Sequence, residues 1–284
     1  MTEGTDQRVT GYRRLPHIRE RPYGSHRRGQ KPELVISVWH SLEKCARVGG
    51  RTHSTMANTT NDEEKQAAAR ASLRFVTSGK IVGLGSGSTA TYAVRFLVEQ
   101  VRSGLRIRGI PTSKATEKLA RSGGIPLTTL DEVAAVDVTI DGADEFDPQL
   151  NLIKGGGGNL LREKIVASAS KFFVIIADSS KQVPMLGKFP LPVEVIPFAQ
   201  TLIKRKIEAL GAKVKVRESA TGDPYITDEG HHLLDCDFGR IPDPAALAQK
   251  LETMPGVVEH GLFLGMANVV LLAKGSEVQE LRRS

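Results

Sequence analysis

The sequence has little cysteine, few aromatic residues and no long apolar run. Its 284 residues include two cysteines, Cys45 and Cys236, and neither has a second Cys or a His at metal-site spacing. We therefore expect a reducing compartment and no disulfide framework. No apolar run approaches the roughly 20 residues of a membrane-spanning helix. We predict a cytoplasmic protein without a membrane partner.

Positive charge is concentrated at one end of the chain. The net charge is +7, and residues 1–55 hold 11 of the 39 Lys and Arg residues but 5 of the 32 acidic ones. The remainder is therefore nearly neutral. Residues 1–55 show no helix-turn-helix pattern and little aromatic interleaving with their basic residues, so we predict no nucleic-acid partner.

Residues 1–55 show no sustained helical or strand period and are rich in Arg, His, Gly and Pro, a composition typical of disorder. A nucleic-acid arm, an organellar transit peptide and a dispensable extension are the three alternatives. Five acidic residues and the lack of a cleavage signature count against a transit peptide. Because Met56 begins a sequence that would serve as an N-terminus by itself, we favour a dispensable basic leader.

From residue 80 onward, apolar segments alternate with polar or glycine-rich loops and helical patterns. This alternation predicts an α/β protein with a Rossmann-like parallel sheet covered by helices. Ligands bind such sheets beyond the carboxyl ends of the strands. Ser113 is the expected cap of the helix that follows it. The predicted strands are residues 80–84, 105–110, 136–140 and 172–177.

The pattern changes after Pro190 to that of a small antiparallel α+β domain. Helices are expected at 198–210 and 243–253, strands at 214–217 and 257–264, and hairpin turns at 222–223 and 228–230. A strand at 269–273 is expected to rejoin the first sheet. The predicted organisation is a leader at 1–55, a Rossmann-like catalytic domain at 56–190, the α+β domain at 191–266, and a return to the catalytic domain at 267–284.

The segment KGGGGNLLREK, residues 154–164, carries the strongest chemical signal. Glycines let a backbone approach a ligand closely, and a helix N-terminus attracts anions. Lys154 adds a positive charge, and Glu163 lies about one turn after Asn159, the expected N-cap. The helix terminus would lower the pKa of Glu163, whereas burial would raise it. The sequence leaves this balance open.

GLGSGST, residues 83–89, is a second candidate anion loop, since hydroxyls and glycines precede a helix. It lacks the GK[ST] ending of a Walker A motif and the last glycine of a dinucleotide-binding motif. A tight turn with a Ser or Thr cap explains it equally well. Lys181, in ADSSK, is either a further phosphate contact or a surface lysine.

DGADEFD, residues 141–147, places four acids in seven residues. Asp141 and Asp144 directly follow a buried strand and could hold a divalent metal, contact sugar hydroxyls or relay protons. The lack of nearby His argues against a transition-metal site, whereas the composition does not exclude a magnesium site. For Glu145 and Asp147 we expect a solvated acidic turn.

Together these motifs resemble the type A ribose-5-phosphate isomerase family. The resemblance extends over roughly residues 60–284 and includes six strings in the family's order. They are GLGSGST, DGADE, KGGGG followed by REK, ADSSK, LGKFPLPVEV (186–195) and PGVVEHGLF (255–263).

The resemblance implies the interconversion of ribose 5-phosphate and ribulose 5-phosphate through an enediolate, without a cofactor or metal. It implies that Glu163 is the base and that Lys154 and Asp141 act at the C1 and C2 oxygens. Asp144 would assist hydroxyl contacts or ring opening. It also implies a homodimer or homotetramer whose only partner besides itself is a small sugar phosphate.

The substrate-binding set that the resemblance implies comes from four loops. We expect the phosphate on residues 86–89 and Lys181, and the reacting carbonyl near Lys154 and its glycine amides. A sugar-phosphate-sensing domain of a transcription regulator, a sugar-phosphate deaminase and a CoA transferase are the rivals. The first needs a DNA-binding domain, and the others should lack the ordered motif series. The set is Ser86, Gly87, Ser88, Thr89, Asp141, Gly142, Ala143, Asp144, Lys154, Gly155, Gly156, Gly157 and Lys181.

Overall fold

The computed structural model describes residues 53–283. The predicted leader, residues 1–55, lies outside this part except for its last three residues, with which helix α1 begins. Predictions about the leader's disorder and purpose therefore concern residues beyond the described ones. No helix in the described part is both long and apolar enough to span a membrane.

A six-stranded sheet forms the centre of the fold, in the order β13-β12-β6-β3-β1-β2. All neighbours are parallel except β12 and β13, which pair antiparallel. The predicted α/β class with a parallel sheet is confirmed, as is the return of the late strand beside β6. Strand β2 begins three residues later than predicted, and β13 was not predicted. The strands are β1 Ile81–Leu84, β2 Arg108–Pro111, β3 Val138–Asp141, β6 Phe173–Asp178, β12 Val269–Lys274 and β13 Glu277–Arg282.

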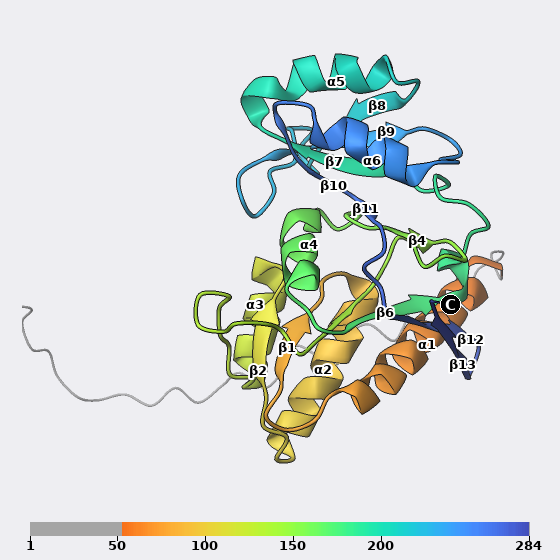
Figure 1. Ribbon diagram of the computed structural model, residues 1–284. Coiled ribbons are helices and arrows are strands. Elements are labelled where there is room, and N and C mark those ends of the chain that lie inside the picture. Colours follow the sequence, from red (N-terminus) through yellow and green to blue (C-terminus); the bar gives the residue numbers. More distant parts are fainter. Residues whose placement is uncertain (1–52, 284) are drawn as a thin grey trace, which may run out of the picture. The chain divides into compact units, whose positions relative to one another are not determined.

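Both faces of this sheet are covered, which explains why its central strands are apolar throughout. Alternate residues of a strand point to opposite faces. Val174 and Ile176 of β6 pack in an apolar cluster with α1 and α2. Phe173 and Ile175 pack on the other side with Phe263. Figure 1 shows α1 and α2 along the sheet and α4 nearer the second sheet. These helices are α1 His53–Ser72, α2 Ser88–Arg102, α3 Lys114–Gly123 and α4 Leu160–Ser168.

The ends of helix α3 follow from local chemistry. Ser113 is its N-cap, as predicted, and its hydroxyl accepts a hydrogen bond from the Thr116 N–H at 3.0 Å. The helix ends at Gly123 and is followed by the C-cap Gly124, whose left-handed φ of 90° suits glycine. The N-cap position also places the Ser113 hydroxyl beside the loop that follows β1.

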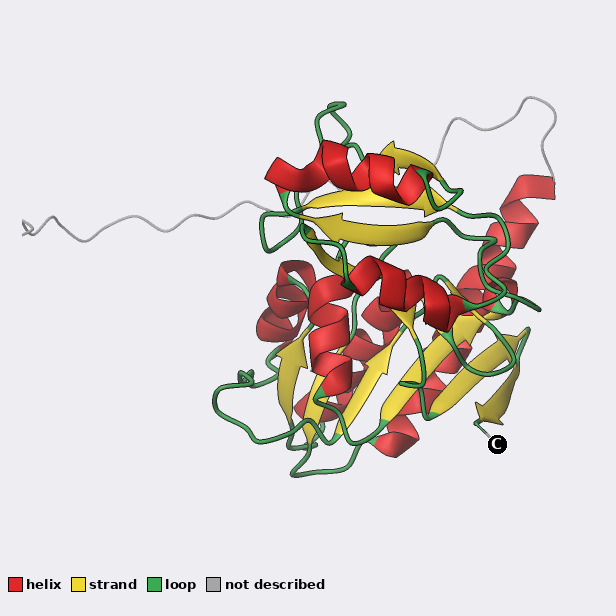
Figure 2. Ribbon diagram, turned by 45° about the horizontal axis from the view of Figure 1, so that its top comes forward, coloured by secondary structure: helices red, strands yellow, loops and turns green. Residues whose placement is uncertain are grey.

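A second, four-stranded antiparallel sheet has the order β10-β7-β9-β8 (Figure 2). Two helices pack on it through one apolar cluster that includes Ile203 and Leu251. The antiparallel α+β character is confirmed, and the domain boundaries at 190 and 266 stay a prediction. The elements are β7 Leu191–Val195, α5 Gln200–Glu208, β8 Lys213–Val216, β9 His232–Asp237, α6 Pro244–Glu252 and β10 Val257–His260. Short 3-10 turns are η1 Leu73–Phe75, η2 Ser179–Lys181 and η3 Pro197–Ala199.

The single strand predicted at 257–264 was wrong, because the chain changes sheets at Gly261. Strand β10 pairs with β7, whereas β11 Leu262–Phe263 joins a three-stranded sheet with β5 Leu152–Ile153 and β4 Glu145–Phe146. Gly261 donates to Pro192 O at 2.8 Å and accepts from Lys154 N at 2.9 Å. A Cβ on it would lie 2.3 Å from Lys154 O, so only glycine permits this approach.

Candidate active site

The candidate site lies where the chain reverses its progress through the central sheet. After β1 the chain adds β2 on one side and then returns to place β3 on the other side of β1. Ligands bind such open sheets at this point, beyond the carboxyl ends of the strands. A cavity of about 80 Å³ occurs there. Its lining comprises Ser86, Gly87, Ser88, Thr89, Gly142, Ala143, Asp144, Lys154, Gly155, Gly156, Gly157, Glu163 and Lys181.

The structure therefore brings all the predicted site residues together around one cavity, with Asp141 directly behind it. Asp141 ends β3 and is completely buried. Its Oδ1 accepts hydrogen bonds from the N–H groups of Ser86 at 3.0 Å and Gly142 at 2.8 Å. A Cβ on Gly85 would lie 2.3 Å from this oxygen. Glycine at position 85 thus allows the carboxylate to sit beneath the loop.

The loop after β1 leads into helix α2, whose N-terminus faces the cavity. Gly87 is the N-cap, with a φ of 91°, and the helix starts at Ser88, so the last two residues of GLGSGST belong to the helix that the sequence placed after them. The first N–H groups of a helix lack partners within it and suit an anion. The Ser86 hydroxyl is already bonded in a buried cluster, 2.7 Å from Thr112 Oγ1 and 2.8 Å from Ser113 Oγ. No local sequence pattern indicates this cluster, because its hydroxyls come from separate loops.

Lys154 links the carboxylates behind and beside the cavity. Its Nζ donates to Gly142 O at 2.6 Å and lies 3.0 Å from Asp141 Oδ2 and 3.3 Å from Glu163 Oε2. Burial lowers the pKa of Lys154, but the charges of Asp141 and Glu163 outweigh it and the net shift is upward. Lys154 therefore keeps its positive charge in an almost fully buried position.

Glu163 lies in the first turn of α4 and is 5 % exposed. Burial raises the pKa of Glu163 to about 8, with Lys154 opposing the shift and Asp141 and Asp144 adding to it. The net shift in the pKa of Glu163 is thus upward, the direction that burial favours. Among the described residues, Oε2 accepts no hydrogen bond of favourable geometry. Apart from its ion pair with Lys154, Glu163 is thus a buried carboxylate with a pKa near neutrality, which suits a general base.

The glycine loop, residues 155–158, is hydrogen-bonded to Asp144. The Gly156 N–H donates to Asp144 Oδ2 at 2.7 Å, and a Cβ on Gly156 would lie 2.4 Å from Asp144 Oδ1. Asn159 occupies the N-cap position of α4, as predicted. Its side chain does not cap the helix, however, but donates to Gly157 O at 3.0 Å. Asn159 therefore braces the loop.

The solvated turn expected for Glu145 and Asp147 was wrong, since they are 2 % and 6 % exposed. Glu145 lies in β4, which pairs with β5, and Asp147 directly follows β4, on the same inward side. Glu145 accepts hydrogen bonds from the N–H groups of Gly187 and Phe189. Asp147 accepts one from Asn151 N at 2.8 Å. Both carboxylates hold loops together rather than facing solvent.

Three further residues were missed by the sequence analysis. Glu64 of α1 is 4 % exposed and accepts hydrogen bonds from Ser179 in the turn that carries Lys181. Arg217, directly after β8, donates to the glycine loop, and Asp235 of β9 accepts hydrogen bonds from Arg217. Nothing in the local sequence marks these contacts, because each joins segments far apart in the chain.

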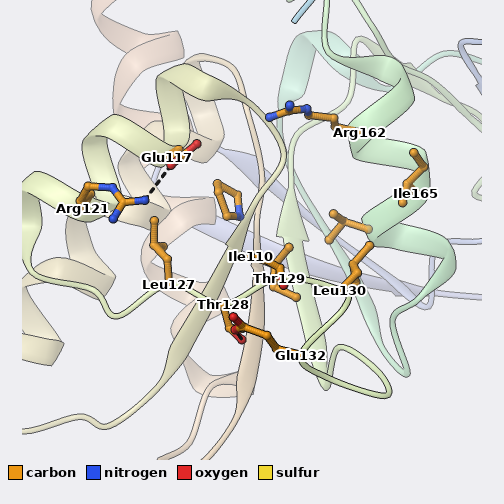
Figure 3. A pocket seen from close by; sticks show the side chains of 12 residues that line it. Ile110, Glu117, Arg121, Leu127, Thr128, Thr129, Leu130, Glu132, Arg162 and Ile165 are labelled. Atoms are coloured by element: carbon orange, nitrogen blue, oxygen red, sulfur yellow. Dashed lines mark hydrogen bonds and ion pairs between the residues drawn. The ribbon is translucent and has the colours of Figure 1, made fainter. Parts of the chain in front are cut away.

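A larger cavity, of about 420 Å³, lies between α3 and α4 (Figure 3). Its arginines are already paired, Arg121 with Glu117 at 2.7 Å and Arg162 with Glu229. By volume alone, this cavity would be the stronger candidate for a ligand site. Two buried carboxylates and a buried lysine, all with raised pKa values, gather at the smaller cavity, whereas the shifted carboxylate of the larger one is the exposed Glu132; a buried cluster of this kind indicates a functional site. No three His, Cys, Asp or Glu side chains of the described part are placed to hold a metal ion.

Comparison with known proteins identifies the family. The family model of ribose 5-phosphate isomerase A (phosphoriboisomerase A) matches residues 108–277. The chain belongs to this family. It is 51 % identical over 230 residues to the ribose-5-phosphate isomerase A of Bradyrhizobium diazoefficiens, a match covering 78 % of this chain and 95 % of the relative. It is 52 % identical over 229 residues to that of Rhodopseudomonas palustris, covering 78 % and 98 %.

Solved structures of family members agree. A D-ribose-5-phosphate isomerase in complex with phospho-erythronic acid matches with a TM-score of 0.76 and 40 % identity, covering 78 % of this chain and 99 % of that one. The ribose 5-phosphate isomerase A of Methanocaldococcus jannaschii matches with a TM-score of 0.75, 40 % identity and the same coverage. The fold and the family of this chain are therefore established together.

Proposed function

We propose that this protein interconverts D-ribose 5-phosphate and D-ribulose 5-phosphate. The observation that carries the proposal is Glu163, a buried carboxylate with a pKa of about 8, beside the Lys154 cation at the family's characteristic loop. Isomerisation of an aldose to a ketose requires a base that works near neutral pH and a group that stabilises an oxyanion.

The reaction follows from this pair. Glu163 takes the proton from C2 of the open-chain aldose, and the electron pair of that C–H bond moves toward the C1 carbonyl. The negative charge on O1 is stabilised by Lys154 and by the amides of the glycine loop. Glu163 then returns the proton to C1, while the O2 hydroxyl proton passes to O1. One C–H bond breaks, one forms, and no electrons leave the substrate.

The aspartates have different roles in this proposal. Asp141 does not line the cavity, so it acts through Lys154, whose ammonium it holds at 3.0 Å. Asp144 lines the cavity and is anchored by the Gly156 N–H, which supports contact with substrate hydroxyls.

We place the phosphate at the start of α2, on the amides of residues 86–89 and Lys181. Lys181 is partly exposed and has no ion-pair partner among the described residues. A related isomerase was solved with phospho-erythronic acid, and for this chain we infer a sugar phosphate, with the phosphate at one end of the site and the reacting carbonyl at the other. A substrate complex with the phosphate seated on Gly155–Gly157 would refute this orientation.

We also infer a homodimer or homotetramer in the cytoplasm. Two large apolar side chains support self-association, since Phe198 is 101 % exposed and Leu202 is 54 % exposed. Sedimentation of the protein tests the inference, and a monomer at micromolar concentration would contradict it.

The test of function is an isomerase assay on ribose 5-phosphate, with and without EDTA. We expect ribulose 5-phosphate to form at the same rate in both conditions. A sugar-phosphate sensor would bind the ligand without turnover, and a deaminase or CoA transferase would leave ribose 5-phosphate unchanged. Binding without isomerisation would therefore contradict the proposal.

A further inference from the structure

We infer that Arg217, held in place by Asp235, is a positioning residue that sets the orientation of the glycine loop for catalysis. The inference rests on the proposed isomerase activity. Both residues lie in the antiparallel α+β part of the chain, at the end of β8 and in β9. They give that part a direct connection to the reacting end of the site.

The guanidinium of Arg217 is shared between a carboxylate and the loop. Its Nε donates to Asp235 Oδ2 at 3.0 Å, and its Nη2 donates to Asp235 Oδ1. Its Nη1 donates to two backbone oxygens, Gly155 O at 2.8 Å and Gly156 O at 3.1 Å. The Arg217 side chain is 14 % exposed, so solvent weakens these bonds little.

These two bonds fix the direction of the loop amides. A peptide unit is planar and trans, so its C=O and N–H point in opposite directions. Holding Gly155 O on Arg217 turns the Gly156 N–H toward Asp144, where it donates at 2.7 Å. Holding Gly156 O in the same way makes the Gly157 N–H point away from Arg217. Gly157 lines the cavity, and no described residue accepts from its N–H.

The loop needs such an external restraint because consecutive glycines have the largest conformational freedom of any residues. An oxyanion is stabilised only by donors that are already oriented when the charge develops. A planar guanidinium can serve a carboxylate and two carbonyls at once, whereas a lysine ammonium has no such fork. The geometry therefore requires arginine at position 217 and a fixed carboxylate at 235.

The experiment compares Arg217→Gln, Arg217→Lys, Asp235→Asn and the double variant Arg217→Gln/Asp235→Asn in the full chain. The control is Arg121→Gln, which removes an exposed arginine–glutamate pair away from the site. We expect kcat of Arg217→Gln to fall about 100-fold, the scale of a slight misplacement of catalytic groups, with KM changed much less. Arg217→Lys should fall between Arg217→Gln and the wild type.

Asp235→Asn should lower kcat about tenfold, and the double variant should be no worse than Arg217→Gln alone, because Asp235 acts through Arg217. Hydrogen exchange of the amides at residues 155–158 should accelerate in Arg217→Gln and stay unchanged in Arg121→Gln. This readout does not depend on activity. Hydrogen exchange therefore tests whether Arg217 positions the loop even if the wild type does not isomerise ribose 5-phosphate. Failure of the wild type to isomerise ribose 5-phosphate would refute the proposed function and not the positioning of the loop.

Wild-type kcat in folded Arg217→Gln, whatever its melting temperature, would overturn the inference. So would additive losses in the double variant, or unchanged hydrogen exchange of the loop. If Arg217→Gln does not fold, Arg217→Lys and Asp235→Asn decide by the same measures, and wild-type kcat in both would overturn it.

Discussion

The Lys154 ammonium lies 3.3 Å from the Glu163 carboxylate, and both side chains are almost fully buried. Asp141 lies on the other side of the same ammonium at 3.0 Å. One cation between two carboxylates leaves an excess negative charge, which burial penalises. A proton on Glu163 relieves this excess, and its pKa of about 8 reflects that balance.

The first prediction concerns the pH dependence of activity. Because Glu163 must be deprotonated to act as a base, kcat/KM should rise with pH from 6 and level off above about 8. The upward shift in the pKa of Lys154 means that its loss of charge does not interfere in this range. Initial rates in buffers of constant ionic strength measure the profile. A flat profile between pH 5 and 8 would contradict the pKa assigned to Glu163.

The second prediction concerns stability. The pKa of Glu163 rises from its ordinary value of 4.5 to about 8 on folding, so between these values the folded state binds more protons than the unfolded state. Its contribution to stability is present below pH 4.5 and is lost as pH rises through 8. Glu163→Gln has no such group. Its free energy of unfolding, measured in urea relative to the wild type, should therefore increase from pH 5 to pH 9. A constant difference would show that the pKa is not raised.

The third prediction separates two adjacent glycines. In Gly156→Ala the new Cβ would lie 2.4 Å from Asp144 Oδ1, so the carboxylate or the loop must move. In Gly157→Ala the nearest atom is Asn159 Nδ2 at 3.7 Å, an ordinary contact. We expect a loss of kcat of about 100-fold in Gly156→Ala and a much smaller loss in Gly157→Ala. Equal losses would show that the approach of Asp144 is not what requires glycine.

The fourth prediction concerns Glu64, which connects α1 to the turn carrying Lys181 and to Gly275. Burial raises the pKa of Glu64, but hydrogen bonds from Gly275 and Ser179 outweigh it and lower the pKa overall. Glu64→Gln removes bonds to a charged acceptor and should destabilise the protein by about 1 to 3 kcal/mol at pH 7. The exposed Glu63→Gln is the matched control.

The sign of the pH effect provides a second check on Glu64. Because folding lowers its pKa, its stabilising contribution is present above the ordinary value of 4.5 and is lost as pH falls below it. The gap between Glu64→Gln and the wild type in urea denaturation should therefore narrow below pH 4. A gap that stays constant would show that the charge of Glu64 does not stabilise the fold.

The parallel sheet and the clustering of three site loops could be predicted from the sequence, because both follow from local patterns. Asp141 follows an apolar strand, a helix follows the glycine- and serine-rich loop after the first strand, and the carboxyl ends of parallel strands meet at one edge. The raised pKa of Glu163 could not be predicted, since it depends on how deeply α4 is buried.

Contacts between distant segments were equally beyond prediction. Arg217 reads as the end of a short strand, and only the folded chain brings it to Gly155. The change of sheets at Gly261 depends on the backbones of Lys154 and Pro192. The burial of Glu145 likewise depends on amide groups more than 40 positions later in the chain. Each of these features arises from tertiary pairing that no local pattern encodes.

The most direct test of the central claim is the turnover of ribose 5-phosphate by Glu163→Gln in deuterium oxide. Glu132→Gln, an exposed residue of the larger cavity, is the control. Loss of a general base should lower kcat by a factor of about 10² to 10⁴, and exchange of the C2 proton with solvent should fall in parallel, while Glu132→Gln retains wild-type values. Near-normal turnover or exchange in Glu163→Gln would contradict the assignment of Glu163 as the base.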